Sequence, residues 1–195
     1  MFLLCRIIFW LPAKLLYPTK IIGKKNLPKK KAIIACNHQS NLDAVLFYLN
    51  TGFKFYTLVK AELYKKRFSR WLFSKLYTIP VNRKENDLGA IKQCLKVLNQ
   101  KDKPLLIFPS GTREEDAKTL DHFKNGTSMI ALKTQSDIIP IAFNRKPRIF
   151  RRTKIYVGEK IEISKFLNQD KDKNEIYNDI TNEIKKSINN LIDAK

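Results

Sequence analysis

One short segment constrains the fold of this chain most strongly: the apolar run AIIAC at residues 32–36, which ends abruptly in the polar sequence NHQSNLD. A short apolar run between polar turn-formers predicts a buried strand that delivers its last residues to an exposed edge of a sheet. In α/β sheets, ligands bind at such strand ends. His38 and Asp43 follow the run directly, so this segment predicts both a fold class and the place of a site.

Similar apolar runs recur along the chain and alternate with segments of helical periodicity. We expect strands at residues 32–36, 55–59, 78–81, 105–108, 138–143 and 154–157. We expect helices at residues 42–49, 68–76, 87–100 and 125–134, and an amphipathic helix at residues 173–195. Pro140 indicates that its strand lies at an edge or contains a bulge, because proline has no N–H to donate to a neighbouring strand. A plain core strand is a strong alternative.

The size and composition of the chain fit one domain. Its 195 residues can bury a sizeable core, and its hydrophobic content of 44% is ordinary for a globular protein. We therefore expect a single-domain α/β fold, with a mixed sheet flanked by helices.

The charge is unusual, with 38 Lys and Arg against 18 Asp and Glu, a formal net charge of +20. Such an excess indicates an anionic partner, which is a nucleic acid, an anionic lipid, a phosphorylated substrate or an acidic carrier protein. Compositional bias of the genome explains the total about equally well. It does not explain local basic groups such as residues 29–31, 65–67 and 145–154.

The N-terminal residues 1–18 are very apolar, but Arg6, Pro12 and Lys14 interrupt them. They lack the roughly 20 uninterrupted apolar residues that a membrane-spanning helix needs, and they lack a signal-peptide cleavage site. We expect residues 1–20 to form an apolar helical segment at a membrane interface. A helix that packs on the protein's own core is the alternative. Residues 21–195 then form the α/β domain, and residues 19–31 a basic connector.

The three cysteines favour neither a disulfide framework nor a metal site. Their number is odd and no pair has metal-ligand spacing, so we expect no metal and a reducing cytoplasm. Cys36 and His38 are two residues apart and share a face of a strand. A nucleophilic Cys–His pair is conceivable there, but a buried strand cysteine is the better interpretation.

Two further polar segments follow apolar runs. The sequence FPSGTR at residues 108–113 follows one expected strand, and its Pro and Gly predict a turn. Arg113 would then present a fork of donors suited to a phosphate, although an ordinary surface ion pair is the alternative. The sequence VNRK at residues 81–84 ends another strand with the basic residue Arg83.

In their order and spacing, these segments resemble the 1-acylglycerol-3-phosphate acyltransferase family of glycerolipid acyltransferases. His38 and Asp43, separated by four residues, match the first block of that family. Arg83 matches the basic residue of the second block, FPSGTR the third, and IPIA at residues 139–142 the fourth. The sequence KAEL at residues 60–63 resembles a lysine-containing stretch between the first two blocks, and the resemblance runs from about residue 21 to 157.

The resemblance implies a mechanism. His38 would take the proton from a lysophospholipid hydroxyl, and Asp43 would hold His38 through its other ring nitrogen. The hydroxyl oxygen would attack an acyl thioester without a covalent acyl-enzyme. Arg83 and Arg113, helped by Lys60, would bind the phosphate of the acceptor. Gly111 and Thr112 of the third block would belong to the same substrate site, with a Gly111 amide as a candidate oxyanion donor.

One residue departs from the family pattern. Ser110 stands where the family usually has glutamate, and a serine cannot form an ion pair with Arg113. Glu114 or Glu115 would have to supply the carboxylate from nearby. Asn37, Ser110 and Glu114 are therefore secondary candidates for the site, and the acceptor is the least constrained part of the hypothesis.

The predicted function is acyl transfer from an acyl thioester to the sn-2 hydroxyl of 1-acylglycerol 3-phosphate, giving phosphatidic acid. The donor is acyl-ACP (acyl carrier protein) or acyl-CoA, and no other cofactor is expected. The expected partners are an anionic membrane surface, the lysophospholipid acceptor and an acidic acyl carrier protein, at the cytoplasmic face of the cell membrane.

Several alternatives remain open at this point. The acceptor could be glycerol 3-phosphate or another lysophospholipid. A serine hydrolase using Ser110 is disfavoured because no G-x-S-x-G elbow is present. A basic, non-catalytic module that binds membrane lipids is a different class of function. A nucleic-acid binder fits the charge, but no recognised nucleic-acid-binding module accompanies it.

Overall fold

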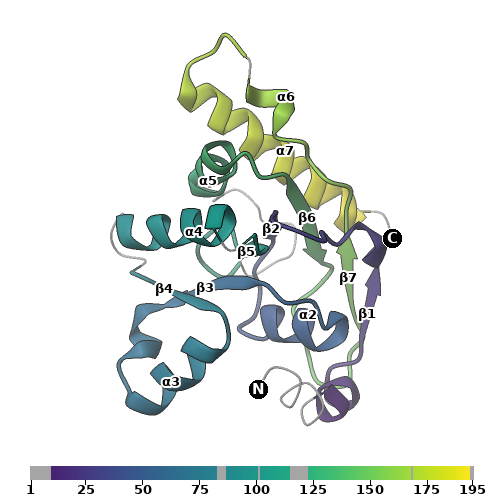
Figure 1. Cartoon of the computed structure of the whole chain (residues 1–195). Helices are drawn as coiled ribbons and strands as arrows, with labels where there is room; N and C mark the ends of the chain where they lie inside the picture. The colour runs from purple at the N-terminus through teal and green to yellow at the C-terminus, as the bar shows by residue number, and fades with distance from the viewer. Residues whose placement is uncertain (1–9, 83–86, 101, 115–122, 168, 194–195) are drawn as a thin grey trace.

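A computed structural model describes residues 10–82, 87–100, 102–114, 123–167 and 169–193 of the chain. Within these residues, seven strands form one sheet in the order β1-β7-β6-β2-β5-β3-β4 (Figure 1). The strands are β1 (Thr19–Ile22), β2 (Ile33–Cys36), β3 (Tyr56–Lys60), β4 (Thr78–Val81), β5 (Leu105–Ile107), β6 (Ile138–Phe143) and β7 (Thr153–Val157). The sheet is mixed, as the sequence predicts, because β6 and β7 are antiparallel and the other pairs are parallel.

Helices cover both faces of the sheet (Figure 1). The helices α2 (Asp43–Thr51) and α3 (Arg67–Lys75) lie below the sheet in that view, and α4 (Leu88–Gln100), α5 (Gly126–Thr134) and α7 (Lys173–Asp193) lie above it. Shorter elements are the 3-10 helices η1 (Lys24–Asn26) and η2 (Ala61–Tyr64), and the helix α6 (Ser164–Leu167). The expected strands and long helices are thus present, with ends shifted by one or two residues.

Each face of the sheet has its own hydrophobic core. On one face, Ile33, Leu105 and Ile138 pack with the isoleucine stripe of α7, of which Ile180, Ile184 and Ile188 are fully buried. On the other face, Ile34 and Ile141 pack with Phe47 of α2 and with neighbouring aromatic side chains. Because β2 is buried on both faces, its sequence is a continuous apolar run instead of an alternating pattern.

The expected connector at residues 19–31 proves to contain a strand. β1 pairs in parallel with β7 along its whole length, from Thr19 opposite Thr153 to Ile22 opposite Tyr156. β1 is a short edge strand with alternating burial, so its four residues, TKII, produce only a weak sequence signal. The sheet therefore begins at Thr19, two residues before the expected domain boundary.

The expected edge position of Pro140 is wrong, but the strand pairing contains a bulge directly opposite it. β6 lies between β2 and β7, inside the sheet, with Pro140 opposite Ala35 of β2. The β6–β7 ladder begins at Ile141, and the Pro140 carbonyl accepts a hydrogen bond from the N–H of Gly158 at 2.9 Å. The antiparallel pairing resumes at Ile138, which lies opposite Ile161, so the partner segment has one extra residue beside Pro140. The missing N–H of Pro140 falls at this bulge. Gly158 leaves room for the ring, because a Cβ there would lie 2.9 Å from Pro140 Cγ.

The expected N-terminal interfacial segment lies partly outside the described residues. Residues 10–16 are helical, and Leu11, Leu15 and Leu16 expose 56%, 65% and 41% of their surface. Lys14 Nζ lies 4.6 Å from the centroid of the Trp10 ring. No helix within the described residues is long and apolar enough to cross a membrane.

Candidate active site

The parallel strands bring the sequence motifs to one edge of the sheet. β2, β3, β4, β5 and β6 all run in the same direction, so their carboxyl ends lie together. His38 follows β2, the FPSGTR segment follows β5, and Lys60 ends β3. β2 and β5 are direct neighbours in the sheet. The edge therefore joins segments far apart in the sequence, as in other α/β ligand sites.

His38 and Asp43 form a buried pair at this edge. His38 Nδ1 lies 3.0 Å from Asp43 Oδ2, and His38 and Asp43 expose only 6% and 0% of their surface. The same Oδ2 accepts hydrogen bonds from the backbone N–H groups of Gln39 and Ser40, each at 2.8 Å. These amides stabilise the carboxylate and fix its position at the start of α2. The pair holds the imidazole by Nδ1, which leaves Nε2 as the nitrogen that can take a proton.

The FPSGTR segment holds His38 from a second side. The Phe108 ring stacks on the imidazole, with centroids 4.0 Å apart and planes inclined by 23°. The backbone N–H of Glu114 donates to the His38 carbonyl oxygen at 2.7 Å. The sequence did not indicate Phe108 as a site residue, because its motif position gives no sign of what the ring contacts. The amides of Gln39 and Ser40 were also missed.

Asn37, a secondary candidate, proves to be a clamp between β2 and β6. Its side chain is fully buried, donates to the Phe143 carbonyl oxygen at 3.0 Å and accepts from the Phe143 N–H at 2.8 Å. The Asn37 amide thus pairs with both backbone groups of Phe143, as a neighbouring strand would, and continues the β2–β6 pairing beyond the end of β2. Asn37 thereby fixes the backbone from which His38 projects.

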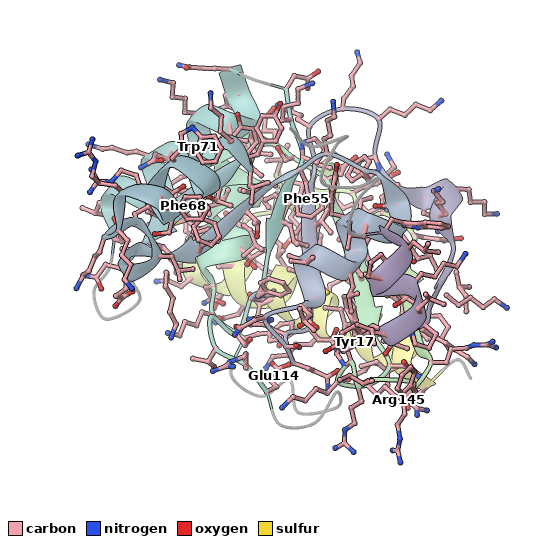
Figure 2. All side chains as sticks on the ribbon, turned by 90° about the horizontal axis from the view of Figure 1, so that it is seen from below. Tyr17, Phe55, Phe68, Trp71, Glu114 and Arg145 are labelled. Carbon is pink, nitrogen blue, oxygen red and sulfur yellow. The ribbon has the colours of Figure 1, made fainter. Side chains whose placement is uncertain are left out.

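Ser110 and Gly111 shape the turn after β5. The Gly111 N–H donates to the Phe108 carbonyl at 2.9 Å, and Gly111 has a φ of 69°, a conformation that glycine adopts without strain. The buried Ser110 hydroxyl donates to the Thr112 carbonyl at 2.7 Å. Ser110 therefore bonds within the turn, and so does the Gly111 amide, which contradicts its expected role as an oxyanion donor. Figure 2 labels Glu114, which ends the described part of this segment and is buried.

The basic candidates are solvent-accessible. Lys60 and Arg113 are exposed at the same edge of the sheet, as is Thr112. Among the described residues, no hydrogen bond or ion pair joins the side chains of these three to the buried His38–Asp43 pair. Arg83, the basic candidate after β4, and Glu115 lie outside the described residues.

Cys36 is not a nucleophile of this site. Burial raises the pKa of its thiol well above the ordinary value of 9.0, and the negative charges of Asp43 and Glu114 raise it further. The thiolate that nucleophilic attack requires is therefore strongly disfavoured. The buried-strand interpretation of Cys36 is confirmed.

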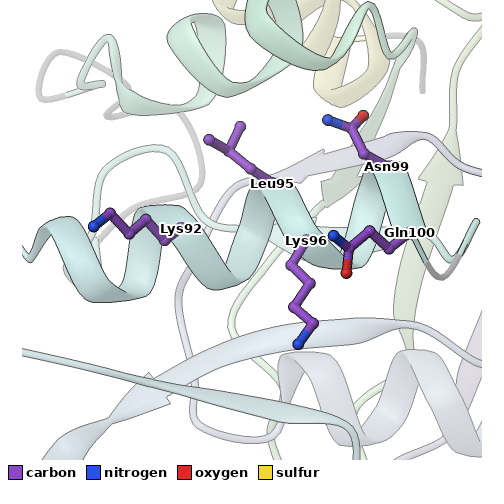
Figure 3. Close-up of a pocket in the computed structure, with 5 residues that line it drawn as sticks. All are labelled: Lys92, Leu95, Lys96, Asn99 and Gln100. Carbon is purple, nitrogen blue, oxygen red and sulfur yellow. The ribbon is translucent and has the colours of Figure 1, made fainter.

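Two other features lie apart from this site. Within the described residues, no group of three or more His, Cys, Asp or Glu side chains is placed to hold a metal ion. A hollow on the outer face of α4 is lined by Lys92, Leu95, Lys96, Asn99 and Gln100 (Figure 3). All five come from one helix and none belongs to the motifs, so this hollow is separate from the candidate active site.

Comparison with known proteins identifies the family. A family model described as acyltransferase matches residues 18–144, which is most of the chain and includes all four motifs. The chain belongs to the acyltransferase family. This match confirms the resemblance that the order of the motifs indicated, and it covers the strands from β2 to β6 whose ends carry the site.

Several curated relatives share the sequence of this region. A 1-acyl-sn-glycerol-3-phosphate acyltransferase of Chlamydomonas reinhardtii is 34% identical over 130 residues, which cover 64% of this chain and 38% of the length of that relative. The protein of that name from Pseudomonas aeruginosa is 31% identical over 147 residues, 72% of this chain and 55% of its own. The chain therefore spans only about half of each relative's length, or less.

A solved structure shows the same fold. The 1-acyl-sn-glycerophosphate (LPA) acyltransferase PlsC from Thermotoga maritima superposes with a TM-score of 0.72 at 23% identity. The match covers 97% of this chain and 79% of that protein. The mixed sheet flanked by helices is thus the fold of a known acyltransferase.

Proposed function

We propose that this chain transfers a fatty acyl group from an acyl thioester to the sn-2 hydroxyl of 1-acylglycerol 3-phosphate, giving phosphatidic acid. The proposal rests chiefly on one observation, the buried His38–Asp43 pair with Nδ1 and Oδ2 3.0 Å apart. The names of the curated relatives support the choice of acceptor. Family membership supports acyl transfer as the reaction class.

In the proposed reaction, His38 acts as the general base. Nε2 takes the proton of the acceptor hydroxyl as its oxygen attacks the thioester carbonyl. The negative charge of Asp43 stabilises the imidazolium that forms. The tetrahedral intermediate then collapses, the C–S bond breaks, and the imidazolium gives its proton to the departing thiolate. The products are the ester and a free thiol, and no covalent acyl-enzyme forms.

The basic side chains at the sheet edge would bind the acceptor's phosphate. Arg113 and Lys60 are exposed at this edge, and Arg83 follows the neighbouring strand β4. A planar guanidinium pairs with two phosphate oxygens at once, which fixes orientation as well as charge. We propose that these cations, with Thr112, hold the phosphate while the hydroxyl reaches His38, and that Gly111 shapes the turn that presents Thr112 and Arg113.

Glu114 is the proposed replacement for the glutamate that the family pattern has at position 110. The Ser110 hydroxyl is engaged by the Thr112 carbonyl, whereas Glu114 is held beside His38 by its own backbone bond. Its negative charge is close enough to Cys36, at the end of β2, to raise the pKa of that thiol. We infer that the carboxylate has moved along the segment and still helps to organise the site.

The proposed setting is the cytoplasmic face of the cell membrane, where lysophospholipid is present. The apolar side chains exposed on residues 10–16 support an interfacial position for the N-terminal segment. The net charge of +20 suits anionic lipids, and it equally suits acyl-ACP or acyl-CoA, both of which are anionic.

The direct test uses purified protein with lysophosphatidic acid and either acyl-CoA or acyl-ACP. Formation of phosphatidic acid by the wild type supports the proposal, and glycerol 3-phosphate and other lysophospholipids in parallel reactions define the acceptor. The non-catalytic alternative predicts vesicle binding without turnover of any acceptor by either donor. That outcome would overturn the proposed activity.

A further inference from the structure

The loop that joins β6 to β7, residues 144–152, begins at the same sheet edge as the candidate active site. It follows Phe143 directly, the residue whose backbone is clamped by Asn37. Figure 2 shows Arg145 of this loop on the same side of the molecule as Glu114 and Tyr17, and away from Phe68 and Trp71 of α3. Whatever this loop contacts therefore lies near the strand ends.

The tip of the loop is a tight turn with two exposed apolar side chains. The Arg151 N–H donates to the Arg148 carbonyl at 3.1 Å, so Ile149 and Phe150 are the central residues of the turn. They expose 53% and 76% of their surface. Phe150 has a φ of 58°, in a position of the turn that glycine or asparagine normally occupies.

This tip is unfavourable for the folded chain in water. A bulky side chain at positive φ is strained, exposed aromatic surface gains nothing from burial, and Arg148 stands directly opposite the like-charged Arg151. The Phe150 side chain belongs to neither hydrophobic core cluster of the described residues. Strained, exposed residues of this kind are typical of positions that meet a ligand or a surface.

Cations surround the apolar tip. Residues 144–152 contain five basic residues and no acidic one. Beside the tip is a hollow of about 550 Å³ that Arg145, Phe150, Arg151, Arg152 and Lys154 line together with Asn144 and Tyr156. No acidic side chain of the described residues lines this hollow. It thus offers four positive charges and an aromatic ring to one anionic group.

The tip is joined to the second exposed apolar segment of the protein. The Phe150 N–H donates to the Leu16 carbonyl at 2.7 Å, so the loop touches the end of the helix at residues 10–16. Leu15 and Leu16 add their exposed surface to that of Ile149 and Phe150. Two segments more than a hundred residues apart therefore meet with exposed apolar side chains on each.

We propose that the β6–β7 loop is a membrane-contact element that binds an anionic lipid bilayer. Ile149 and Phe150 enter the boundary between headgroups and acyl chains, and the hollow between Arg145 and Arg152 takes a lipid phosphate. Apolar side chains flanked by arginines suit this interface, because the arginine stems can lie along apolar surface while their charges reach phosphates. An acidic protein would match the charge but not the apolar tip.

This contact goes beyond the proposed activity and gives it an orientation. With the loop and residues 10–16 on the bilayer, the strand ends that carry His38 face the membrane surface. A lysophospholipid would then reach the site without leaving the interface. Binding to vesicles requires no turnover, so a failure of this proposal is distinct from a failure of the proposed function.

The first experiment measures sedimentation of the full chain with vesicles of phosphatidylcholine, with and without phosphatidylglycerol. We expect Ile149→Ser/Phe150→Ser to weaken binding at least tenfold. Arg148→Gln/Arg151→Gln/Arg152→Gln should lose on the order of a hundredfold on the anionic vesicles, at about fivefold per cation, and much less on neutral ones. Matched controls on α4, Leu88→Ser and Lys92→Gln/Lys96→Gln, should bind as the wild type does, although their side chains are equally exposed.

A second variant separates membrane binding from a structural role. Phe150→Asn places at the positive φ a residue that tolerates it. We expect this variant to have an equal or higher thermal midpoint than the wild type while it binds anionic vesicles more weakly. A merely structural Phe150 would instead lower the thermal midpoint and leave vesicle affinity unchanged.

A label gives the position of the tip directly. Phe150→Cys in a Cys5→Ser background, labelled with an environment-sensitive fluorophore, should shift to the blue on anionic vesicles, whereas the same label at Leu88→Cys should not. Unchanged vesicle affinity in both loop variants would overturn the proposal. So would variants that bind vesicles normally but have a raised KM for acyl-CoA, because the hollow would then serve the acyl donor.

Discussion

The imidazole of His38 lies face to face with the ring of Phe108, with centroids 4.0 Å apart. One residue follows β2 and the other follows β5, so this contact links the first and third motifs across two neighbouring strands. The Phe108 ring fixes the plane of the imidazole, and the hydrogen bond with the Asp43 carboxylate fixes which ring nitrogen faces Asp43. The position of the proposed base therefore depends on two motifs.

Replacement of Phe108 by leucine should lower kcat by between about tenfold and about a hundredfold, because a small misplacement of a catalytic group has effects of that size. KM for both substrates should change little, since Phe108 acts through His38. The measurement is steady-state formation of phosphatidic acid. Phe55→Leu, in the core cluster against which Phe108 packs, is the matched control and should retain its rate. Equal losses of kcat in both variants would contradict a positioning role.

Asn37→Ala should destabilise the fold by about 2–3 kcal/mol, because it leaves the buried N–H and carbonyl of Phe143 without their partner. Urea unfolding followed by circular dichroism gives this difference. Asn50→Ala, which removes an amide that bonds only one carbonyl on the surface of α2, should cost much less. An Asn37→Ala variant as stable as the wild type would show that the amide clamp does not hold the end of β2 to β6.

Not all of this site was accessible from the sequence. The run at residues 32–36 predicts β2, and the residues that follow it identify the acid–base pair, because apolar runs and polar turns are local features. The Asn37 clamp depends on Phe143, 106 positions away, and no local pattern records that pairing. The Phe108 stack was missed for the same reason.

The strands likewise differ in how well the sequence predicts them. Strands buried on both faces, such as β2 and β6, are evident from their composition. β1 was missed because four residues at an edge are too few to establish a period. Pro140 lies inside the sheet and not at its edge, because the pairing between β6 and the segment after β7 shifts by one residue beside it. No local sequence pattern records that shift.

The two described cysteines predict how stability changes at high pH. Burial raises the pKa of Cys36 well above its ordinary value of 9.0, and raises that of Cys94 to about 12. Above pH 9.0 the thiols ionise in the unfolded state while the folded state keeps them protonated. The contribution of the two thiols to the free energy of unfolding is therefore complete below pH 9.0 and is lost as the pH rises towards the raised pKa values. Wild type should lose more unfolding free energy than Cys36→Ala/Cys94→Ala over this range. Parallel pH profiles for the two proteins would contradict the assignment.

Arg113→Ala should raise KM for lysophosphatidic acid by at least about tenfold, because a charge-assisted pair with a phosphate is lost. KM for the acyl thioester should change by less than about twofold. The control is Lys103→Ala, which removes an exposed cation before β5, at the opposite end of the strand from Arg113. Equal increases in KM for both substrates would show that Arg113 does not select the acceptor.

The central claim is that His38 removes the proton from the acceptor hydroxyl. Its most direct test is the rate of phosphatidic acid formation by His38→Ala at saturating lysophosphatidic acid and acyl thioester, in a variant shown to be folded. We predict a rate at least about a hundredfold below that of the wild type, since general-base catalysis contributes about that much or more. A His38→Ala rate within a few-fold of the wild type would contradict the account.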